Sequence, residues 1–359
     1  MRLLYLYTEG WTDRHAREVQ TLSTCVALAR SGVDVTLVTG GGETEIQDHL
    51  HDVADAPEVP GLHLVVLSRS LGPLESTAIF SRNFSYWLRS RRVPFDLGYI
   101  IHLKAGPILT QAGIPYAYEA HGIFAQAPQN ASRQRSLHKM EGQVLTGASR
   151  LVATSAALGV ALRTWYGLGQ DFAVVPNAGL PPLSRGLSSP TGPFVYCGSI
   201  AEGRDLSGII QAARDTQSPL KIVGGNEEEW RLLGEKLDTS GITWRPRVRF
   251  NDVPEILAGA RAGLIPNDFD APAGEFSCPL KLFDYARCGL PVLSTALPAL
   301  QSLEVGPWCT QVPSPARVAW IEPLNTFRYE AEHAEAARAW SAEHTWTQRA
   351  EQLKRAFGL

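Results

Sequence analysis

Apolar runs alternate with helical patterns along much of the chain. Residues 3–7 are apolar, apolar positions recur at helical spacing between residues 19 and 29, and residues 33–39 are again apolar. This succession predicts a β-α-β unit. Further strand-like runs follow at residues 62–67, 97–103, 116–120, 151–154 and 172–175. Repeated alternation of this kind predicts a parallel sheet with helices on both faces.

The pattern is interrupted once and then restarts. Residues 180–193 are rich in Pro, Ser and Gly and have no periodicity, which favours an interdomain linker. Strands are then expected at residues 194–197, 220–223, 248–250, 262–265 and 291–294, and helices at 206–214 and 227–237. The sequence therefore predicts two Rossmann-like domains, residues 1–179 and 194–328. A helical tail, residues 329–359, is expected to pack back on the first domain.

Composition narrows the classes of function. A chain of 359 residues exceeds what one core usually organises, and a net charge of -3 argues against a nucleic-acid-binding protein. The five cysteines are scattered without zinc-binding spacing, which favours reduced thiols in a cytoplasmic protein. No stretch approaches the roughly 20 apolar residues of a membrane-spanning helix. We also find no acidic cluster typical of a metal site, and the sequence leaves the oligomeric state open.

The turn after the first strand of the second domain has features of a phosphate site. Residues 196–205 read YCGSIAEGRD. Gly198 lets the backbone approach a diphosphate, Ser199 can donate a hydrogen bond, and Arg204 can form a forked ion pair. The alternative is an ordinary strand-to-helix turn with a solvated arginine.

A longer motif follows at residues 275–295, which read EFSCPLKLFDYARCGLPVLST. It predicts a loop, a helix that begins near Pro279 and a strand from residue 291. Lys281 and Asp284 are three residues apart and share a helix face, so a cation and an acceptor carboxylate lie together. The alternative is a local surface ion pair.

This motif resembles the donor-binding signature of family 4 retaining glycosyltransferases, which have the two-domain GT-B fold. Residues 151–155 (LVATS), 174–179 (VVPNAG) and 344–350 (HTWTQRA) resemble further landmarks of that family in the same order. The resemblance implies two Rossmann-like domains that face each other across a cleft. It also implies an enzyme that moves a hexosyl group from a UDP- or GDP-linked sugar to a hydroxyl acceptor, with retention and without a metal or other cofactor. The acceptor class is left open as a glycan, a lipid-linked molecule or a small molecule.

Individual roles come with the resemblance. Asp284 would bind the donor ribose, while Arg204 and Lys281 would stabilise the leaving diphosphate beside the helix start. The implied donor-binding residues are Gly198, Ser199, Arg204, Glu275, Pro279, Leu280, Lys281 and Asp284. Two departures stand out: the family commonly has an arginine where this chain has Ser199, and its first glutamate matches Phe276, with Glu275 one position away.

The first domain supplies the other implied residues. Residues 118–122 (YEAHG) resemble the strand end whose histidine faces the transferred sugar, so His121 joins Arg204 and Lys281 as a catalytic residue. The implied acceptor-side residues are Gly10, Trp11, Glu119 and His121. Gly10 and Trp11 occupy the turn where the family has a Gly-rich loop.

Other functions stay open. The same architecture carries nucleotide-sugar epimerases, and the missing arginine and shifted glutamate leave room for a nucleotide-sugar-binding pseudoenzyme or partner subunit. Residues 82–92 (RNFSYWLRSRR) form a basic amphipathic stretch, typical of a solvated helix face or of peripheral contact with an anionic membrane or charged acceptor.

Overall fold

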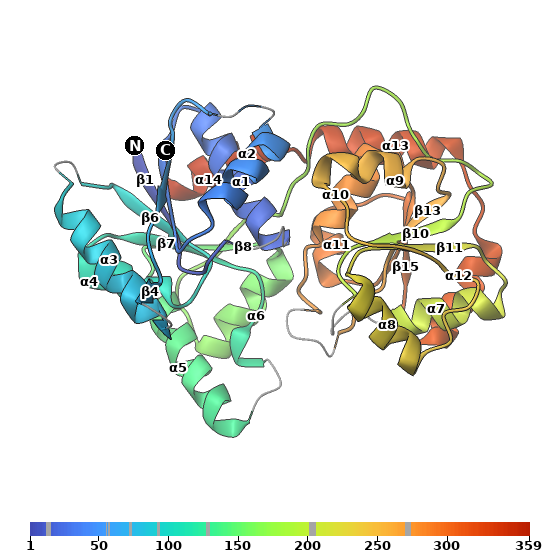
Figure 1. Ribbon diagram of the computed structural model, residues 1–359, viewed down its shortest axis with the longest axis horizontal. Coiled ribbons are helices and arrows are strands. Elements are labelled where there is room, and N and C mark those ends of the chain that lie inside the picture. The colour runs from blue at the N-terminus through green and yellow to red at the C-terminus, as the bar shows by residue number, and fades with distance from the viewer. Residues whose placement is uncertain are drawn as a thin grey trace. The chain divides into compact units, whose positions relative to one another are not determined.

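The computed structural model describes residues 1–11, 16–54, 56, 58–71, 74–91, 94–126, 130–200, 206–269 and 274–359. They form two compact units, residues 1–176 with 346–359, and residues 177–345 (Figure 1). Each unit contains a parallel sheet with helices packed against it. The predicted α/β class with two Rossmann-like domains is confirmed.

The first unit is built on a seven-stranded parallel sheet. Its strands are β1 (Arg2–Tyr7), β2 (Asp34–Thr39), β3 (Leu62–Val66), β6 (Leu97–Ile100), β7 (Tyr116–Ala120), β8 (Arg150–Ala153) and β9 (Ala173–Val174). They pair in the order β3-β2-β1-β6-β7-β8-β9. Its helical segments are α1 (Ala16–Arg30), α2 (Glu43–Ala54), α3 (Thr77–Arg89), α4 (Ala105–Ala112), η1 (Phe124–Gln126), α5 (Ala131–Gly147), α6 (Ala156–Tyr166) and α14 (Trp346–Phe357), and a hairpin of β4 (Ser70–Leu71) and β5 (Leu74–Glu75) precedes α3.

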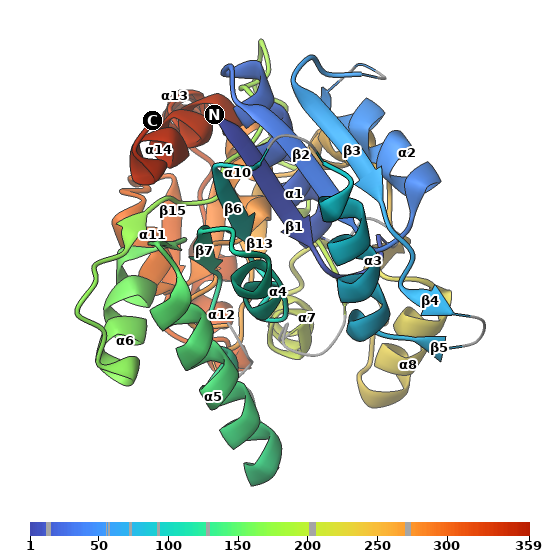
Figure 2. The same cartoon turned by 90° about the vertical axis from the view of Figure 1, so that its left-hand side faces the viewer.

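Strand β1 lies near the middle of this sheet. Leu4 is level with Thr36 of β2 on one side and with Gly98 of β6 on the other. Five of the six residues of β1 are buried, because a central parallel strand is covered on both faces and so tolerates a continuous apolar run. Helix α14 lies against α1, so the end of the chain completes the first unit (Figures 1 and 2).

The second unit is built on a six-stranded parallel sheet. Its strands are β10 (Phe194–Cys197), β11 (Leu220–Val223), β12 (Thr243–Arg245), β13 (Ala262–Ile265), β14 (Val292–Thr295) and β15 (Cys309–Val312), in the order β12-β11-β10-β13-β14-β15. Its helical segments are α7 (Leu206–Asp215), α8 (Glu227–Lys236), η2 (Phe250–Asp252), α9 (Val253–Leu257), α10 (Leu280–Arg287), α11 (Pro298–Ser302), α12 (Arg317–Thr326) and α13 (Ala331–Ala342). With β10 counted as strand 1, this is the 3-2-1-4-5-6 order of a Rossmann sheet.

Two strands of the second unit differ from the prediction. The strand expected at residues 248–250 is wrong: residues 250–252 form η2, and the edge strand is β12. Trp244 of β12 stacks on Trp230 with ring centroids 5.4 Å apart and donates a hydrogen bond to the carbonyl of Gly224 at 3.0 Å. The stacking and the hydrogen bond of this half-buried indole hold the strand at the edge of the sheet. β15 was not predicted, because its residues Cys309–Val312 are only half apolar.

The division of the chain differs in detail from the expected boundaries. The first crossing between the units falls after Pro176, so residues 177–193 belong to the second unit. Helix α13 packs on α10 in the second unit, and only α14 of the expected tail joins the first. Within the described ranges, no helix has both the length and the apolar composition needed to span a lipid bilayer.

Candidate active site

In both sheets the strand order reverses beside the first strand of the unit. β10 lies between β11 and β13 in the second unit, and β1 lies between β2 and β6 in the first. Open α/β sheets bind ligands outside the carboxyl ends of the strands at such a reversal. The residues that follow β10 and β1 are therefore the first places to search for a site.

Gly198 follows β10 and lies directly against Lys281. A methyl group placed on Gly198 would lie 2.8 Å from Lys281 Nζ and 3.0 Å from the Tyr196 hydroxyl oxygen. The Lys281 ammonium also lies 4.1 Å from the centroid of the Tyr196 ring, and the Tyr196 hydroxyl donates to the Ser199 carbonyl at 2.5 Å. Two residues that are far apart in sequence, Gly198 and Lys281, thus meet at the end of β10.

The turn after β11 packs against the turn that contains Gly198. The Gly198 amide donates to the Val223 carbonyl at 2.9 Å. Gly224 has φ +139°, and a methyl group there would lie 1.8 Å from the Gly198 carbonyl oxygen. Only a residue without Cβ lets the two turns pack so closely.

Asp284 lies one helical turn after Lys281 on α10. Its carboxyl is partly buried, and burial raises its pKa from 3.8 to about 6, against the lowering effect of Arg287. Burial, together with the negative charge of Asp284, raises the pKa of the Cys197 thiol at the end of β10 to about 12. The next residue, Tyr285, accepts a hydrogen bond from the Cys197 N–H at 2.8 Å, so the helix that carries Lys281 and Asp284 meets the end of β10.

The other predicted donor-side residues differ in how far they are exposed. Pro279 is buried and precedes the first turn of α10, and Leu280 begins that helix, whose first N–H groups have no intrahelical acceptor. Ser199 and Glu275 are exposed. Arg204 lies outside the described residues.

Asn177 links the chain crossing to the loop before α10. Its side-chain amide donates to the Cys278 carbonyl at 2.6 Å, and the side chain is buried. The sequence predicts residues 174–179 only as the end of the first domain. The Pro-Asn pair was the available signal, because a buried asparagine commonly fixes a loop by bonding to backbone groups.

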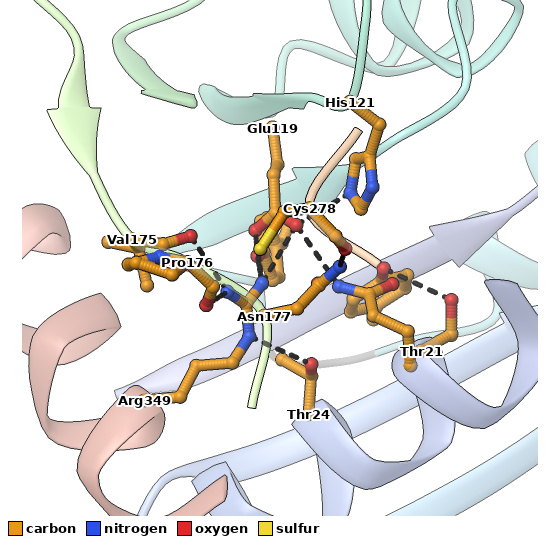
Figure 3. Close-up of polar contacts among 12 residues, drawn as sticks. Thr21, Thr24, Glu119, His121, Val175, Pro176, Asn177, Cys278 and Arg349 are labelled. Carbon is orange, nitrogen blue, oxygen red and sulfur yellow. Dashed lines mark hydrogen bonds and ion pairs between the residues drawn. The ribbon is translucent and has the colours of Figure 1, made fainter. Parts of the chain in front are cut away.

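In the first unit, Glu119 and His121 follow each other across the end of β7. Arg349 Nη2 lies 2.7 and 2.6 Å from the two oxygens of Glu119, and His121 Nε2 lies 2.6 Å from Oε1 (Figure 3). Gln20 donates to the same carboxylate at 3.0 Å, and the Tyr99 hydroxyl donates to it as well. The Glu119 side chain is fully buried, whereas 27% of the His121 side chain is exposed. Of this pair, only His121 is open to a ligand.

The charge of Glu119 is fixed by these partners. Burial alone would raise its pKa, but Arg349 and then His121, with the Tyr99 hydrogen bond, lower it to about 2. The carboxylate is therefore ionised at every working pH. Glu119, predicted to lie on the acceptor side, is buried among four partners and instead supports His121.

The turn after β1 contains Gly10 and Trp11. Trp11 is 4% exposed, packs on Tyr7 with ring centroids 5.2 Å apart, and donates from Nε1 to His49 Nδ1 at 2.9 Å. Gly10 is partly exposed. The backbone at Gly10 remains available to a ligand, but the Trp11 indole is part of the core and holds the loop in place.

A polar cluster that sequence reasoning missed lies at the reversal point of the first sheet. His102 follows β6, its ring lies 4.6 Å from that of Tyr7, and its Nε2 is 3.7 Å from Glu9 Oε2. Arg17 Nη1 lies 3.7 Å from the same Glu9 oxygen. Burial and the nearby Arg17 lower the pKa of His102 to about 3, so the ring is neutral. The signal available was the strand order, because Glu9 and His102 each come just after one of the two adjacent strands β1 and β6.

Profile comparisons match both halves of the chain. The glycosyl transferase 4-like domain matches residues 17–178, and a glycosyl transferase-like domain matches residues 204–355. No curated protein matches the sequence.

Solved structures share the fold at low sequence identity. HepE (Alr3699) of Anabaena, solved with UDP-glucose, has a TM-score of 0.71 and 14% identity, over 100% of this chain and 99% of its own. WaaG, a glycosyltransferase involved in lipopolysaccharide biosynthesis, has a TM-score of 0.69 and 17% identity, over 100% of both chains. A UDP-N-acetylglucosamine 2-epimerase has a TM-score of 0.57 and 10% identity, over 100% of this chain and 97% of its own. At these identities the likeness establishes the fold.

Proposed function

Because the chain belongs to the family 4-like glycosyltransferases with the GT-B fold, we propose that it transfers a hexosyl group from a UDP-sugar to a hydroxyl acceptor with retention of configuration. The observation that carries this proposal is the contact of Gly198 with Lys281 at the carboxyl end of β10, with Asp284 one turn later on the same helix. A cation, an open backbone turn and a carboxylate at one strand end suit a diphosphate next to a ribose.

In this proposal the second domain binds the donor. Lys281, the start of α10 at Pro279 and Leu280, and Arg204 stabilise the diphosphate, since helix N-termini and cationic side chains attract phosphate. Asp284 accepts hydrogen bonds from the two ribose hydroxyls. UDP is the preferred nucleotide over GDP because HepE was solved with UDP-glucose and with UDP.

Transfer then depends on position and charge. The acceptor oxygen bonds to the anomeric carbon on the face from which the phosphate leaves, the bond from that carbon to the phosphate oxygen breaks, and the leaving oxygen takes the acceptor proton. Lys281 and Arg204 offset the charge on the diphosphate, so the proposal needs no metal and no other cofactor. His121 contacts a hydroxyl of the transferred sugar, and Glu275 is the carboxylate nearest in sequence to the family's sugar-binding position.

The acceptor is proposed to lie at a membrane surface on the cytoplasmic side. Helix α3 and the adjacent β4–β5 hairpin (Figure 2) carry exposed apolar side chains, Tyr86 at 81% and Leu74 at 68% exposure. Arg82 and Arg89 of α3 line a depression of about 430 Å³ with Tyr86. Apolar and cationic side chains on one helix suit an anionic bilayer surface, which supports a lipid-linked acceptor over a freely soluble one.

Two other functions compete with transfer. The fold shared with a UDP-N-acetylglucosamine 2-epimerase favours an epimerase acting on the same class of donor. Ser199, in place of the family's arginine, favours a nucleotide-sugar-binding protein without turnover. Both alternatives predict nucleotide binding, so turnover separates them from the proposal.

The test combines binding and turnover. Calorimetric titration with UDP, GDP, dTDP and ADP should give the highest affinity for UDP, and Lys281→Ala should weaken UDP binding about tenfold, as expected for loss of one hydrogen bond to a charged group. Lys236→Ala, an exposed lysine on α8, is the matched control and should bind as the wild type. Release of UDP from UDP-sugars with lipid-linked acceptors should follow. Epimerised donor, or binding without turnover across a broad acceptor panel, would reject the transferase.

A further inference from the structure

Arg349 of α14 is buried at a junction of three parts of the first unit. Its side chain is 2% exposed. Nη2 bonds both oxygens of Glu119, Nη1 donates to the Val175 carbonyl at 2.9 Å and also to that of Pro176, and Nε lies 3.4 Å from Thr24 Oγ1 (Figure 3). The guanidinium therefore has acceptors for all of its nitrogens. These hydrogen bonds hold the guanidinium in place in addition to packing.

Glu119, held in place by Arg349, in turn fixes the position of His121. The carboxylate is ionised, and His121 Nε2 lies 2.6 Å from its Oε1; a lone pair on Nε2 would make this contact repulsive, so the ring proton belongs on that nitrogen. In a neutral imidazole the other nitrogen, Nδ1, then has the free lone pair. The ring orientation and the tautomer are set together.

We infer that Arg349 is a positioning residue: through Glu119 it holds His121 with the proton on Nε2, so that Nδ1 accepts a hydrogen bond from a hydroxyl of the transferred sugar. The inference rests on the proposed function, which assigns His121 to that sugar. A hydroxyl that donates its hydrogen bond to Nδ1 holds the sugar in one of several possible orientations. A fixed orientation of the reacting sugar raises the transfer rate.

The surroundings of Glu119 make Arg349 the decisive partner. Among the described residues, the other titratable groups that face the carboxylate are Tyr5 of β1, Tyr99 of β6, Tyr118 of β7 and His121. Burial raises the pKa of each of these three tyrosines, so they are neutral. His102, which follows β6, lies near His121, and its ring is neutral. Arg349 is thus the permanent positive charge among the partners of Glu119.

The first experiment reads the tautomer directly. The wild-type protein, labelled with ¹⁵N-histidine, is measured by long-range ¹H–¹⁵N NMR at pH 8, and His121→Gln identifies the His121 signals. The inference expects a protonated Nε2 and an unprotonated Nδ1. A protonated Nδ1, or a ring that exchanges between tautomers, overturns it. This measurement needs no turnover, so it is independent of the proposed function.

The second experiment removes the charge. Arg349→Met should lower kcat on the order of 10- to 100-fold with little change in the KM for donor, because the second unit is untouched. Without Arg349, burial favours the protonated carboxyl, so the remaining activity should rise with pH through neutrality while the wild type shows no such rise. Arg349→Lys keeps the charge and should restore the wild-type pH profile with an intermediate kcat. Arg355→Gln, an exposed arginine on the same helix, is the control and should match the wild type.

A purely structural role is separated by a double variant. Arg349→Met with Glu119→Leu leaves no uncompensated charge in the core, which favours folding. The inference expects kcat to stay low in this folded protein. Recovery of wild-type kcat overturns it. Loss of UDP binding in any of these variants would instead count against the assignment of the donor site to the second domain alone.

Discussion

The Asp284 carboxylate is expected to lower the free energy of unfolding of the protein, although it binds the donor. Its partly buried carboxyl titrates at about 6 instead of 3.8 because burial disfavours the charged form. At 1.36 kcal/mol for each pH unit this corresponds to roughly 3 kcal/mol. Since the side chain is still partly open to water, we reduce the figure to about 1–2 kcal/mol. Asp284→Asn should therefore raise the free energy of unfolding of the nucleotide-free protein by about that amount at pH 8.

The pH dependence fixes the sign of the effect. Below pH 3.8 the carboxyl is protonated in both the folded and the unfolded protein, so the substitution should change little. Between pH 3.8 and 6 the unfolded state releases its proton first, so the wild type loses stability relative to Asp284→Asn as the pH rises. Above pH 6 the full difference should be present.

The assay pairs urea unfolding with calorimetry. Asp284→Asn should be more stable than the wild type at pH 8 and similar at pH 4, and should bind UDP roughly 10- to 100-fold more weakly because a charged acceptor for the ribose is lost. Glu322→Gln, an exposed carboxylate on α12, should change neither quantity. A destabilised Asp284→Asn at pH 8 would refute the burial argument, and unchanged UDP affinity would refute the ribose assignment.

Three further outcomes are expected. Gly198→Ala should weaken UDP binding on the order of tenfold, measured by calorimetry, because the new methyl group would displace the Lys281 ammonium, with unfolding nearly unchanged. Gly224→Ala should lower the free energy of unfolding by at least about 1 kcal/mol in urea, since φ +139° and the contact with the Gly198 carbonyl both exclude a side chain. Trp11→Phe should lose about 1 kcal/mol of stability through its bond to His49 while the KM for acceptor stays constant; a changed KM would return Trp11 to the acceptor side.

The donor-side residues that the structure places near one another, Gly198, Lys281 and Asp284, have local signals in the sequence. Lys281 and Asp284 are one helical turn apart, and Gly198 follows a short apolar strand, but only the family resemblance assigned the two segments to one site. Glu119 and His121 were also predicted as site residues, but the burial of Glu119 was not predicted. Its main partner, Arg349, is 230 residues away, and no local pattern marks an arginine in an amphipathic helix as buried. A pairing of this kind depends on α14 packing back on the first unit, and only the folded structure shows that contact.

The packing of α14 on the first unit also affects the order in which the two units can fold during translation. The second unit is one continuous segment, residues 177–345, and can fold as soon as it leaves the ribosome. The first unit must wait for Arg349, which is made 230 residues after Glu119, or roughly 10–50 s later at ordinary translation rates. During that interval the carboxylate lacks its permanent counter-charge and α1 lacks the helix that covers it. The half of the protein made first is therefore the half completed last, and a chain that ends before residue 346 would contain the whole second unit but a first unit without α14.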